Sequence, residues 1–297
     1  MRGSLHWCFG VGLAAALLAL SGATSAHRVV RHHGAGAPHL RSAYVLVVDQ
    51  DTGKVLYAKN PETVSSIASI TKLMTAMVTL DKHLPLDETL EFTRDDRTSE
   101  GWGRSPLHPG VHITRGQALH LALMSSENHA ANLLGRTYPG GLRAFVAAMN
   151  AKARSLGMAH SSFADSIGLN PGNRASPEDL VRMVKAAYQY GLIRRDSVSS
   201  GYDFRIGRRS FHFHSTDRLV YNHRWHLDLQ KTGYISVAGH CLVLSTDIHG
   251  RRVLMVLLDS AGKYSRFADA QRVRNWLETR HYARTHAPAA GRGQPSA

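Results

Sequence analysis

Hydrophobic and polar positions along this chain predict strands near both ends of the sequence and helices between them. Two apolar runs flank Asp51-Thr52-Gly53, which is a hairpin signal. Apolar residues at helical spacing predict helices at 69–82, 115–136 with a break, 140–156 and 176–190. Strand patterns return over 202–259, and a final amphipathic helix covers 266–280. We therefore predict one α+β unit whose two ends meet in a single sheet.

One helix start is defined by its residue types as well as by its period. Ser176 is suited to the N-cap, Pro177 to the first helical position, and Asp179 to the place three residues after the cap. We expect the Ser176 hydroxyl to accept a backbone hydrogen bond there.

The chain ends differ from the middle in composition. Residues 1–26 contain Arg2, an apolar stretch and then small residues, which is typical of a secretory signal and too short for a comfortable membrane span. Residues 27–40 are interpreted as a flexible linker and 283–297 as a disordered tail, leaving a domain at 41–282. Removal of the signal leaves Cys241 as the single cysteine, so no intramolecular disulfide is expected. We predict a periplasmic protein that is soluble after signal cleavage.

The formal net charge is +14, and arginine supplies most of it. Such a surplus suggests a polyanionic partner, and for a cytoplasmic chain nucleic acid would be the first candidate. The export signal argues against nucleic acid and favours, at most, peripheral association with a membrane or the anionic sacculus. Compositional bias without any partner accounts for the charge equally well.

The stretch SSIASITKLM places Ser69 three residues before Lys72 in an apolar run. On a helix these two side chains share one face. Because a lysine head is costly to bury unpaired, Lys72 either extends to solvent or acts inside the core. The spacing alone is weak, since Ser260 and Lys263 repeat it at a place where Gly262 disfavours a helix.

Two further motifs each occur once: Ser126-Glu127-Asn128 between two helical stretches, and Lys231-Thr232-Gly233 before a strand-like run. A serine is a poor nucleophile until a base takes its proton, and Lys72 is the nearest candidate. Burial and a second cation at Lys231 would both favour the neutral amine. Singly, the motifs are explained by a capping serine, a solvated lysine and a turn glycine; jointly they indicate a catalytic site.

The motifs, in this order, resemble those of penicillin-interacting serine peptidases. The flanking words IASITKLMTAMVTLD, MSSENHAANLL, FADSIGLNPGNRASPEDL and LQKTGYISVAGHCLV are similar to the low-molecular-mass penicillin-binding proteins of the D-alanyl-D-alanine carboxypeptidase and endopeptidase family. The resemblance covers about residues 42–282. It implies a β-lactamase/D,D-peptidase-like fold, with a central antiparallel sheet, flanking helices and an inserted helical subdomain.

The resemblance also implies a role for each residue of the first two motifs. Ser69 would be the acyl-ester nucleophile and Lys72 its general base. Ser126 would return the proton to the leaving amine. Asn128 would contact a substrate amide and orient Lys72, while Glu127 faces away.

For the third motif, the resemblance implies that Lys231 and Thr232 anchor the substrate carboxylate. Gly233 would let the substrate backbone lie close to the strand. The backbone N–H groups of Ser69 and Tyr234 would form the oxyanion hole.

The histidines suggest a metal site only weakly. His212 and His214 share one face of an expected strand, and His223 and His226 follow, but no carboxylate or thiolate stands at ligand spacing. Since acyl transfer to a serine needs no metal, we expect neither a metal nor a cofactor.

The favoured interpretation is a monomeric serine D,D-peptidase that acts on peptidoglycan stem peptides or cross-links and binds β-lactams. A serine β-lactamase is the enzyme alternative; class A members deacylate with a glutamate after the second motif, and no Glu lies between Asn128 and Pro177. The non-enzyme alternative is an inactive wall-binding scaffold, but a scaffold would not need the complete motifs. The short stretch after Gly233 has no room for a second domain and anchor, so we favour a compact soluble endopeptidase over a carboxypeptidase.

Overall fold

The computed structural model describes residues 36–98 and 105–285. The predicted signal and most of the predicted linker lie outside these residues, as do residues 286–297, so those assignments stay predictions. The last helix ends at Thr285, beyond the predicted domain end at residue 282. Within the described part of the chain, no helix combines the length and apolar character needed to cross a membrane.

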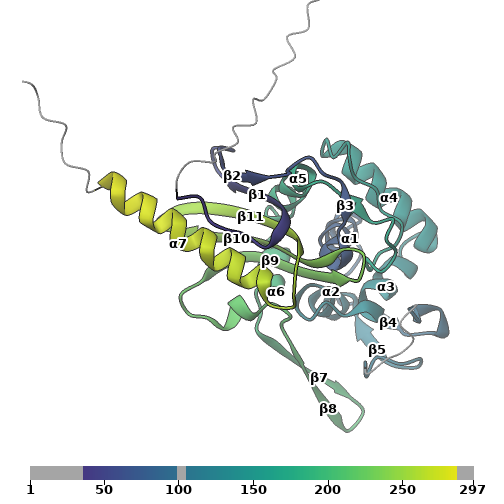
Figure 1. Ribbon diagram of the computed structural model, residues 1–297. Helices are drawn as coiled ribbons and strands as arrows, with labels where there is room; N and C mark the ends of the chain where they lie inside the picture. Colours follow the sequence, from purple (N-terminus) through teal and green to yellow (C-terminus); the bar gives the residue numbers. More distant parts are fainter. Residues whose placement is uncertain (1–35, 99–104, 286–297) are drawn as a thin grey trace, which may run out of the picture. The chain divides into compact units, whose positions relative to one another are not determined.

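A five-stranded antiparallel sheet forms the centre of the domain (Figure 1). Its order is β2-β1-β11-β10-β9, with strands β1 (Ser42–Asp49), β2 (Val55–Lys59), β9 (His226–Ile235), β10 (Gly239–Ile248) and β11 (Arg251–Ser260). Strand β1 pairs with β11 from Ser42 opposite Ser260, which joins the two ends of the domain. The prediction that the ends meet in one sheet is therefore confirmed, as is the hairpin around Gly53, whose φ is +72°.

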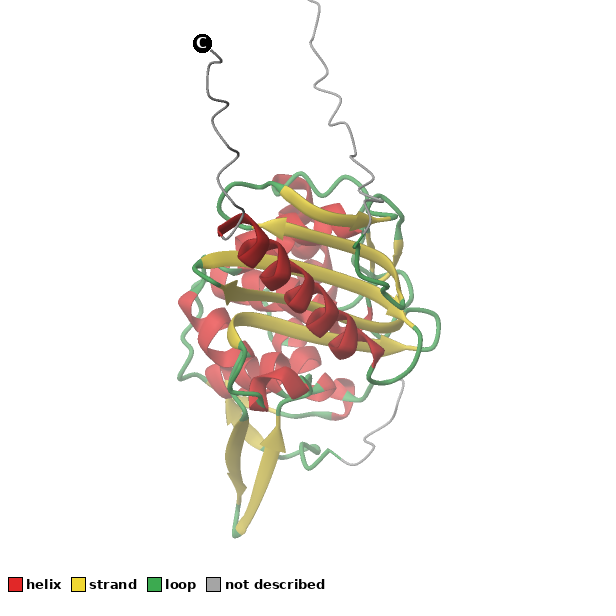
Figure 2. Cartoon of the chain, turned by 60° about the vertical axis from the view of Figure 1, so that its left-hand side comes forward, coloured by secondary structure: helices red, strands yellow, loops and turns green. Residues whose placement is uncertain are grey.

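Both faces of the sheet are covered, and the strand sequences explain why. In β1, Val45 and Val47 pack on the side of helix α7 (Ser265–Thr285), whereas Leu46 and Val48 pack on the side of the other helices. Figure 2 shows α7 crossing one face of the sheet, with the other helices behind it. Strands buried on both faces require continuous apolar runs, such as CLVL in β10 and VLMVLL in β11.

The helical part lies between β2 and β9 in the sequence. It contains η1 (Ala68–Ile70), α1 (Thr71–Asp81), α2 (Arg115–Met124), α3 (Asn128–Arg136), α4 (Gly141–Ser155), α5 (Pro177–Ala187) and α6 (Gly191–Ser197). Helix α1 is buried on every side from Thr71 to Thr79, as expected of a core helix. The observed α+β architecture confirms the predicted fold class.

Short elements complete the chain. They are the pairs β3 (Ser65–Ser66) with β6 (Arg174–Ala175), β4 (Thr89–Glu91) with β5 (His112–Thr114), and β7 (Gly201–Ile206) with β8 (Arg209–His214), together with η2 (Arg94–Asp96) and η3 (Arg218–Tyr221). The β7–β8 hairpin projects from the rest of the domain in both ribbon views (Figures 1 and 2).

Side-chain caps fix the helices that carry the second motif. Thr114 and Gln117 form a capping box at the start of α2, and the Glu127 carboxylate accepts the Ala130 N–H at 2.7 Å at the start of α3. Glu127 is therefore the N-cap of α3. The turn between the two capped helices holds Ser126 in place. The predicted cap at α5 is confirmed, since the Ser176 hydroxyl accepts the Asp179 N–H at 3.2 Å.

Candidate active site

The first motif brings a serine and a buried lysine together. Lys72 is fully buried and Ser69 is 9% exposed. The Lys72 Nζ atom lies 2.9 Å from the Ser69 Oγ, 2.7 Å from the Asn128 Oδ1 and 2.8 Å from the Ile167 carbonyl oxygen. Both predicted contacts of the lysine, with Ser69 and Asn128, are thus present, and the contact with Ile167 is additional. A neutral amine held this way has its lone pair available to the serine proton.

The prediction that an α-helix begins at Ser69 is wrong. Ser69 lies within the 3-10 turn η1, and α1 begins at Thr71. The preceding residue, Ala68, has a φ of +47°, in the left-handed region. Such a backbone costs a non-glycine residue about 1–3 kcal/mol and interrupts a regular helix. The strain lies next to the candidate nucleophile, where it fixes the direction of the Ser69 backbone.

The second motif occupies the turn between α2 and α3. Ser126 has a φ of +60°, again in the left-handed region, and Asn128 is the first residue of α3. The amide oxygen of Asn128 accepts a hydrogen bond from Lys72. The orienting role predicted for Asn128 is therefore supported by its geometry, while the relay role of Ser126 stays a prediction.

The third motif lies on β9, against the nucleophile turn. A Cβ added to Gly233 would stand 3.0 Å from the Ile67 carbonyl oxygen and 3.1 Å from the Ser69 nitrogen. We predicted this glycine as space for the substrate backbone, but the structure gives it a second use, because it lets β9 approach η1. Next to it, Tyr234 is 56% exposed and its ring stacks on His240 at a centroid distance of 4.3 Å.

The lysine of the third motif is buried among positive charges. Lys231 is 0% exposed, and its Nζ donates to the Thr232 carbonyl oxygen at 3.0 Å. Burial, followed by the charges of Lys72 and Arg266, holds the pKa of Lys231 well below its usual value. The repulsion between Lys72 and Lys231 is mutual, so the second cation that we expected near Lys72 is in place.

The loop 165–170 completes the site, although its sequence predicted no role for it. The carbonyl oxygen of Ile167 accepts from Lys72 and also lies 3.4 Å from the Ser69 hydroxyl. Gly168 has a φ of +87°, and a Cβ there would lie 2.1 Å from the Ala68 carbonyl oxygen. A glycine is therefore required for this loop to reach the nucleophile turn.

Asp165 gives the loop its shape. Its carboxylate accepts the backbone N–H groups of Ile167 at 2.9 Å, Gly168 at 2.5 Å and Asn170 at 2.7 Å, as well as the side chain of Asn173 at 2.8 Å. The segment DSIGLN contained a signal, since an aspartate followed by glycine three residues later is typical of a side-chain-stabilised turn. It could have predicted the turn, but not its contact with Lys72.

His212 and His214, considered above as metal ligands, lie on the β7–β8 hairpin. On β8 the rings of His212 and His214 are 4.3 Å apart, and the Nδ1 of His212 lies 2.7 Å from a carboxylate oxygen of Asp203 on the paired strand. That carboxylate was missed because it comes from across the hairpin. Within residues 36–98 and 105–285 no group of three His, Cys, Asp or Glu side chains could hold a metal ion.

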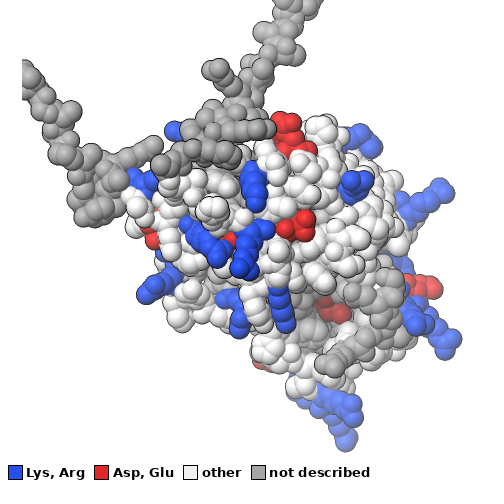
Figure 3. All heavy atoms as spheres, viewed as in Figure 1, with Lys and Arg blue, Asp and Glu red and all other residues white. Residues whose placement is uncertain are grey.

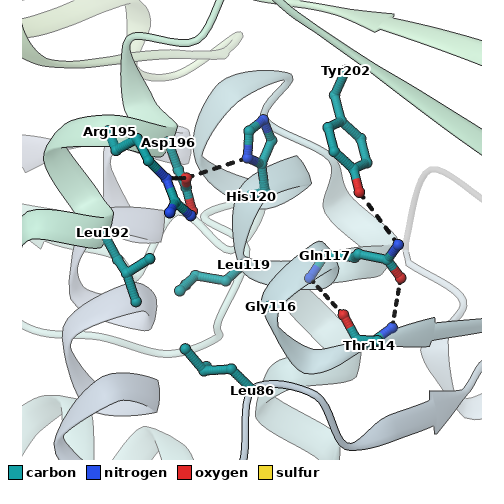
Figure 4. Close-up of a pocket in the computed structure, with 10 residues that line it drawn as sticks. All are labelled: Leu86, Thr114, Gly116, Gln117, Leu119, His120, Leu192, Arg195, Asp196 and Tyr202. Carbon is teal, nitrogen blue, oxygen red and sulfur yellow. Dashed lines mark hydrogen bonds and ion pairs between the residues drawn. The ribbon is translucent and has the colours of Figure 1, made fainter.

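A separate pocket of about 390 Å³ lies beside α2 and α6 (Figure 4). Three leucines line its apolar part, and a Tyr202–Gln117 hydrogen bond and a His120–Asp196 ion pair lie at its polar side. None of the predicted site residues lines it. The pocket is therefore distinct from the cluster around Ser69 and Lys72.

Comparison with known proteins agrees with the geometry of the three motifs. The model of the D-alanyl-D-alanine carboxypeptidase family, peptidase family S11, matches residues 31–262. This chain belongs to that family. The serine D-Ala-D-Ala peptidase interpretation drawn from the motifs is confirmed, and the family places all three motifs in one matched region.

Two similar proteins are named as D-alanyl-D-alanine endopeptidases, and a solved structure shares the fold. The chain is 46% identical over 263 residues to a D-alanyl-D-alanine endopeptidase of Pseudomonas aeruginosa, covering 87% of this chain and 84% of the relative. It is 43% identical over 247 residues to a D-alanyl-D-alanine endopeptidase of Escherichia coli K12, covering 82% and 80%. The crystal structure of the Streptomyces K15 DD-transpeptidase superimposes with a TM-score of 0.75 at 25% identity, covering 80% of this chain and 97% of that one.

Proposed function

We propose that this family member hydrolyses D-alanyl bonds of peptidoglycan through an acyl-enzyme on Ser69, and that it cleaves cross-links in preference to terminal D-alanine. The observation that carries the mechanism is the 2.9 Å contact between the Ser69 hydroxyl and the buried Lys72 amine, with Asn128 holding the amine from the other side. The preference for cross-links is supported by the two similar endopeptidases, whose sequences this chain covers over 84% and 80% of their length.

In acylation, the Ser69 oxygen attacks the D-alanyl carbonyl carbon while its proton passes to the Lys72 Nζ. The carbonyl oxygen becomes an oxyanion that the N–H groups of Ser69 and Tyr234 stabilise. The proton then passes by way of Ser126 to the leaving amine as the peptide bond breaks. Water hydrolyses the resulting ester by the reverse proton path and regenerates the serine.

Lys231 and Thr232 recognise the free carboxylate that lies beyond the scissile bond in either type of substrate. Both side chains are buried at the edge strand β9, at 0% and 4% exposure. A desolvated cation binds a carboxylate more strongly than an exposed one does, because little solvent screens the attraction. The same anchor would hold the carboxylate of a penicillin.

A long-lived penicillin adduct distinguishes this proposal from a β-lactamase. The stretch between Asn128 and Pro177 contains no glutamate, and its one acid, Asp165, has its oxygens engaged in the loop that it shapes. No carboxylate of this stretch is therefore available to activate a deacylating water. We expect the drug to remain attached.

The decisive assay compares two purified muropeptides, a monomeric pentapeptide and a cross-linked dimer, with mass spectrometry of the products. We expect faster cleavage of the dimer, and no cleavage of either substrate by a Ser69→Ala variant. Faster release of D-alanine from the pentapeptide would instead assign a carboxypeptidase and leave the catalytic serine unchanged.

For location, we propose the periplasm, with loose attachment of a monomer to the anionic sacculus. Lys and Arg side chains are spread over the face of the molecule in Figure 3, where they exceed the acidic ones. Such an attraction weakens with salt. Fractionation should find the mature protein in the periplasm, released from isolated sacculi by about 0.5 M NaCl; a salt-resistant membrane-bound form would contradict this.

A further inference from the structure

Asp217 is a buried carboxylate with an incomplete set of partners. It is 0% exposed, and its Oδ1 accepts the Leu219 N–H at 2.8 Å at the start of η3. Its Oδ2 is buried and has no hydrogen-bond partner among the described residues. A buried, charged oxygen without a hydrogen bond lowers the stability of the fold. Stabilisation of the fold therefore does not explain an aspartate at this position.

The segment that carries Asp217 is hydrogen-bonded to the end of α2, just before the second motif, and to the third motif. The backbone N–H of Thr216 donates to the Met124 carbonyl oxygen at 3.3 Å, two residues before Ser126. The Thr216 hydroxyl lies 2.6 Å from the Thr232 hydroxyl, in the third motif. Asp217 is thus held beside the candidate carboxylate anchor without being part of either motif.

Two buried cations on other elements, β9 and α7, interact electrostatically with Asp217. Lys231 on β9 is 0% exposed, and Arg266 on α7 is 8% exposed with a buried Nε that has no partner among the described residues. The Asp217 charge acts on both cations, and Lys72 repels Lys231. Arg266 also acts on His240 and Cys241 of β10, on which Lys263 and Asp259, respectively, act as well.

Among these groups, Asp217 is the one that favours a charged Lys231. Burial, Lys72 and Arg266 all lower the pKa of Lys231, while Asp217 raises it. Burial raises the pKa of Asp217 to about 6, with the Leu219 N–H, Arg266 and Lys231 acting in the opposite direction. At neutral pH most Asp217 side chains are therefore ionised and act on the lysine.

We propose that Asp217 is a positioning residue whose negative charge keeps Lys231 protonated, so that Lys231 can hold the substrate carboxylate. The inference rests on the proposed function, since it requires Lys231 to be the anchor. No ion pair joins Asp217 to Lys231 within the described part of the chain. This separation is useful, because a direct ion pair would compete with the substrate for the ammonium group.

The test measures binding rather than catalysis, in a Ser69→Ala background that cannot form the acyl-enzyme. The probes are an N-acylated L-lysyl-D-alanyl-D-alanine peptide and its C-terminal amide, titrated by NMR between pH 5.5 and 9. The ratio of the two dissociation constants measures the preference for a carboxylate. We expect this preference to disappear with rising pH as Lys231 loses its proton.

Adding Asp217→Asn should move that loss to lower pH, which makes carboxylate binding about tenfold weaker at pH 8 and leaves amide binding unchanged. At pH 5.5 the two proteins should differ less, because Lys231 is protonated more fully in both. Asp217→Glu should restore part of the preference at pH 8. Asp269→Asn, which removes a different buried acid on α7, serves as the control for general destabilisation.

The outcomes separate the inference from the proposed function. If Lys231→Met leaves the carboxylate preference intact, or if the Ser69→Ala protein shows none, Lys231 is not the anchor and the proposed function fails at that point. If Lys231→Met abolishes the preference but Asp217→Asn leaves its pH dependence unchanged, the inference is overturned and the anchor stands. Equal weakening of both peptides at every pH would give Asp217 a merely structural role and would also overturn it.

Discussion

Helix α7 and the motif region both bury charged side chains against the same sheet, but they satisfy these charges differently. On α7, Asp269 is 0% exposed and its carboxylate accepts the backbone N–H groups of Arg41 and Ser42 and the Ser42 hydroxyl. Arg272 adds an ion pair at 2.7 Å. A buried charge with a full set of partners joins the start of β1 to the last helix and stabilises the fold.

In the motif region the charges are left partly uncompensated. Lys231 is bonded to a neutral backbone carbonyl and repelled by Lys72, and one Asp217 oxygen has no hydrogen bond among the described residues. Each of these arrangements costs stability, and together they leave the Lys231 ammonium group without a paired carboxylate in the part of the chain that the structure describes. The difference between Asp269 and Asp217 teaches that a buried acid with a full set of partners joins structural elements, whereas a buried acid with an incomplete set lies beside the candidate carboxylate anchor.

The largest expected effect is the loss of the nucleophile. Ser69→Ala should abolish covalent labelling by a fluorescent penicillin and change the free energy of unfolding by less than about 1 kcal/mol, because it removes one hydroxyl in a polar site. Ser260→Ala is the matched control, since Ser260 also stands three residues before a lysine but its buried hydroxyl has no partner among the described residues. Normal labelling of Ser69→Ala would end the proposed mechanism.

The next effect concerns the base. Lys72→Arg keeps the positive charge but cannot lose its proton at working pH, so the second-order rate constant of acylation should fall by roughly 10³-fold or more. Stopped-flow quenching with a penicillin measures it, and Lys263→Arg in the second serine–lysine pair is the control. An unchanged rate would move the role of base to Ser126.

For Asp269 on α7 we expect a loss of stability with little change in the acylation rate. Asp269→Asn should lower the free energy of unfolding by about 1.5–3 kcal/mol, because it removes the buried charge that accepts the N–H groups of Arg41 and Ser42 and the Ser42 hydroxyl. The acylation rate of the folded fraction should remain within about twofold, since single mutations act mainly near their own contacts. Urea unfolding and penicillin labelling at 15 °C test both halves. A parallel loss of both would contradict the division into two regions.

The smallest effect is a pH dependence of stability in the motif region. Burial raises the pKa of Asp217 to about 6 in the folded protein, above the ordinary value for an aspartate, so the folded protein binds this proton more tightly than the unfolded chain. The free energy of unfolding should therefore fall as pH rises from about 4 to about 6, by up to about 3 kcal/mol from this group.

The Asp217→Asn variant tests this dependence, because its side chain carries no titrating proton. Its stability relative to the unmodified protein should increase over the same pH window, as measured by urea unfolding at pH 4, 5, 6 and 7. A constant difference across the window would show that the Asp217 pKa is not raised, and the contrast with Asp269 would lose its electrostatic basis.

Much of this molecule could be predicted from local patterns. The sheet, most helices and the Ser176 cap follow from apolar period and residue type, and the motif residues Ser69, Lys72 and Asn128 are in contact in the structure. These features were accessible because each depends on short sequence words. Helix α6 (Gly191–Ser197) was not predicted, since a helix of 7 residues is too short for a periodic signal.

The remaining features depend on the tertiary structure. The Ile167 carbonyl that accepts from Lys72 has no side-chain signature, and 95 positions separate the two residues. The start of α1 was misplaced because the left-handed backbone of Ala68 is imposed by the packing around it. Asp217 was overlooked because an aspartate is ordinarily exposed, and only the fold places it among buried cations.

The pairing of β1 with β11 has a consequence for how the protein comes into existence. Ser42 lies opposite Ser260, so the centre of the sheet cannot close until the chain has been synthesised through residue 260. Contacts of such large sequence separation slow folding, since a long loop must close before any pairing is gained. The Ser69 site depends on the same closure, because β9 supports its turn. A nascent chain would therefore be unable to bind penicillin until β11 is available to pair with β1, and antibiotic binding would report on the closure of the sheet.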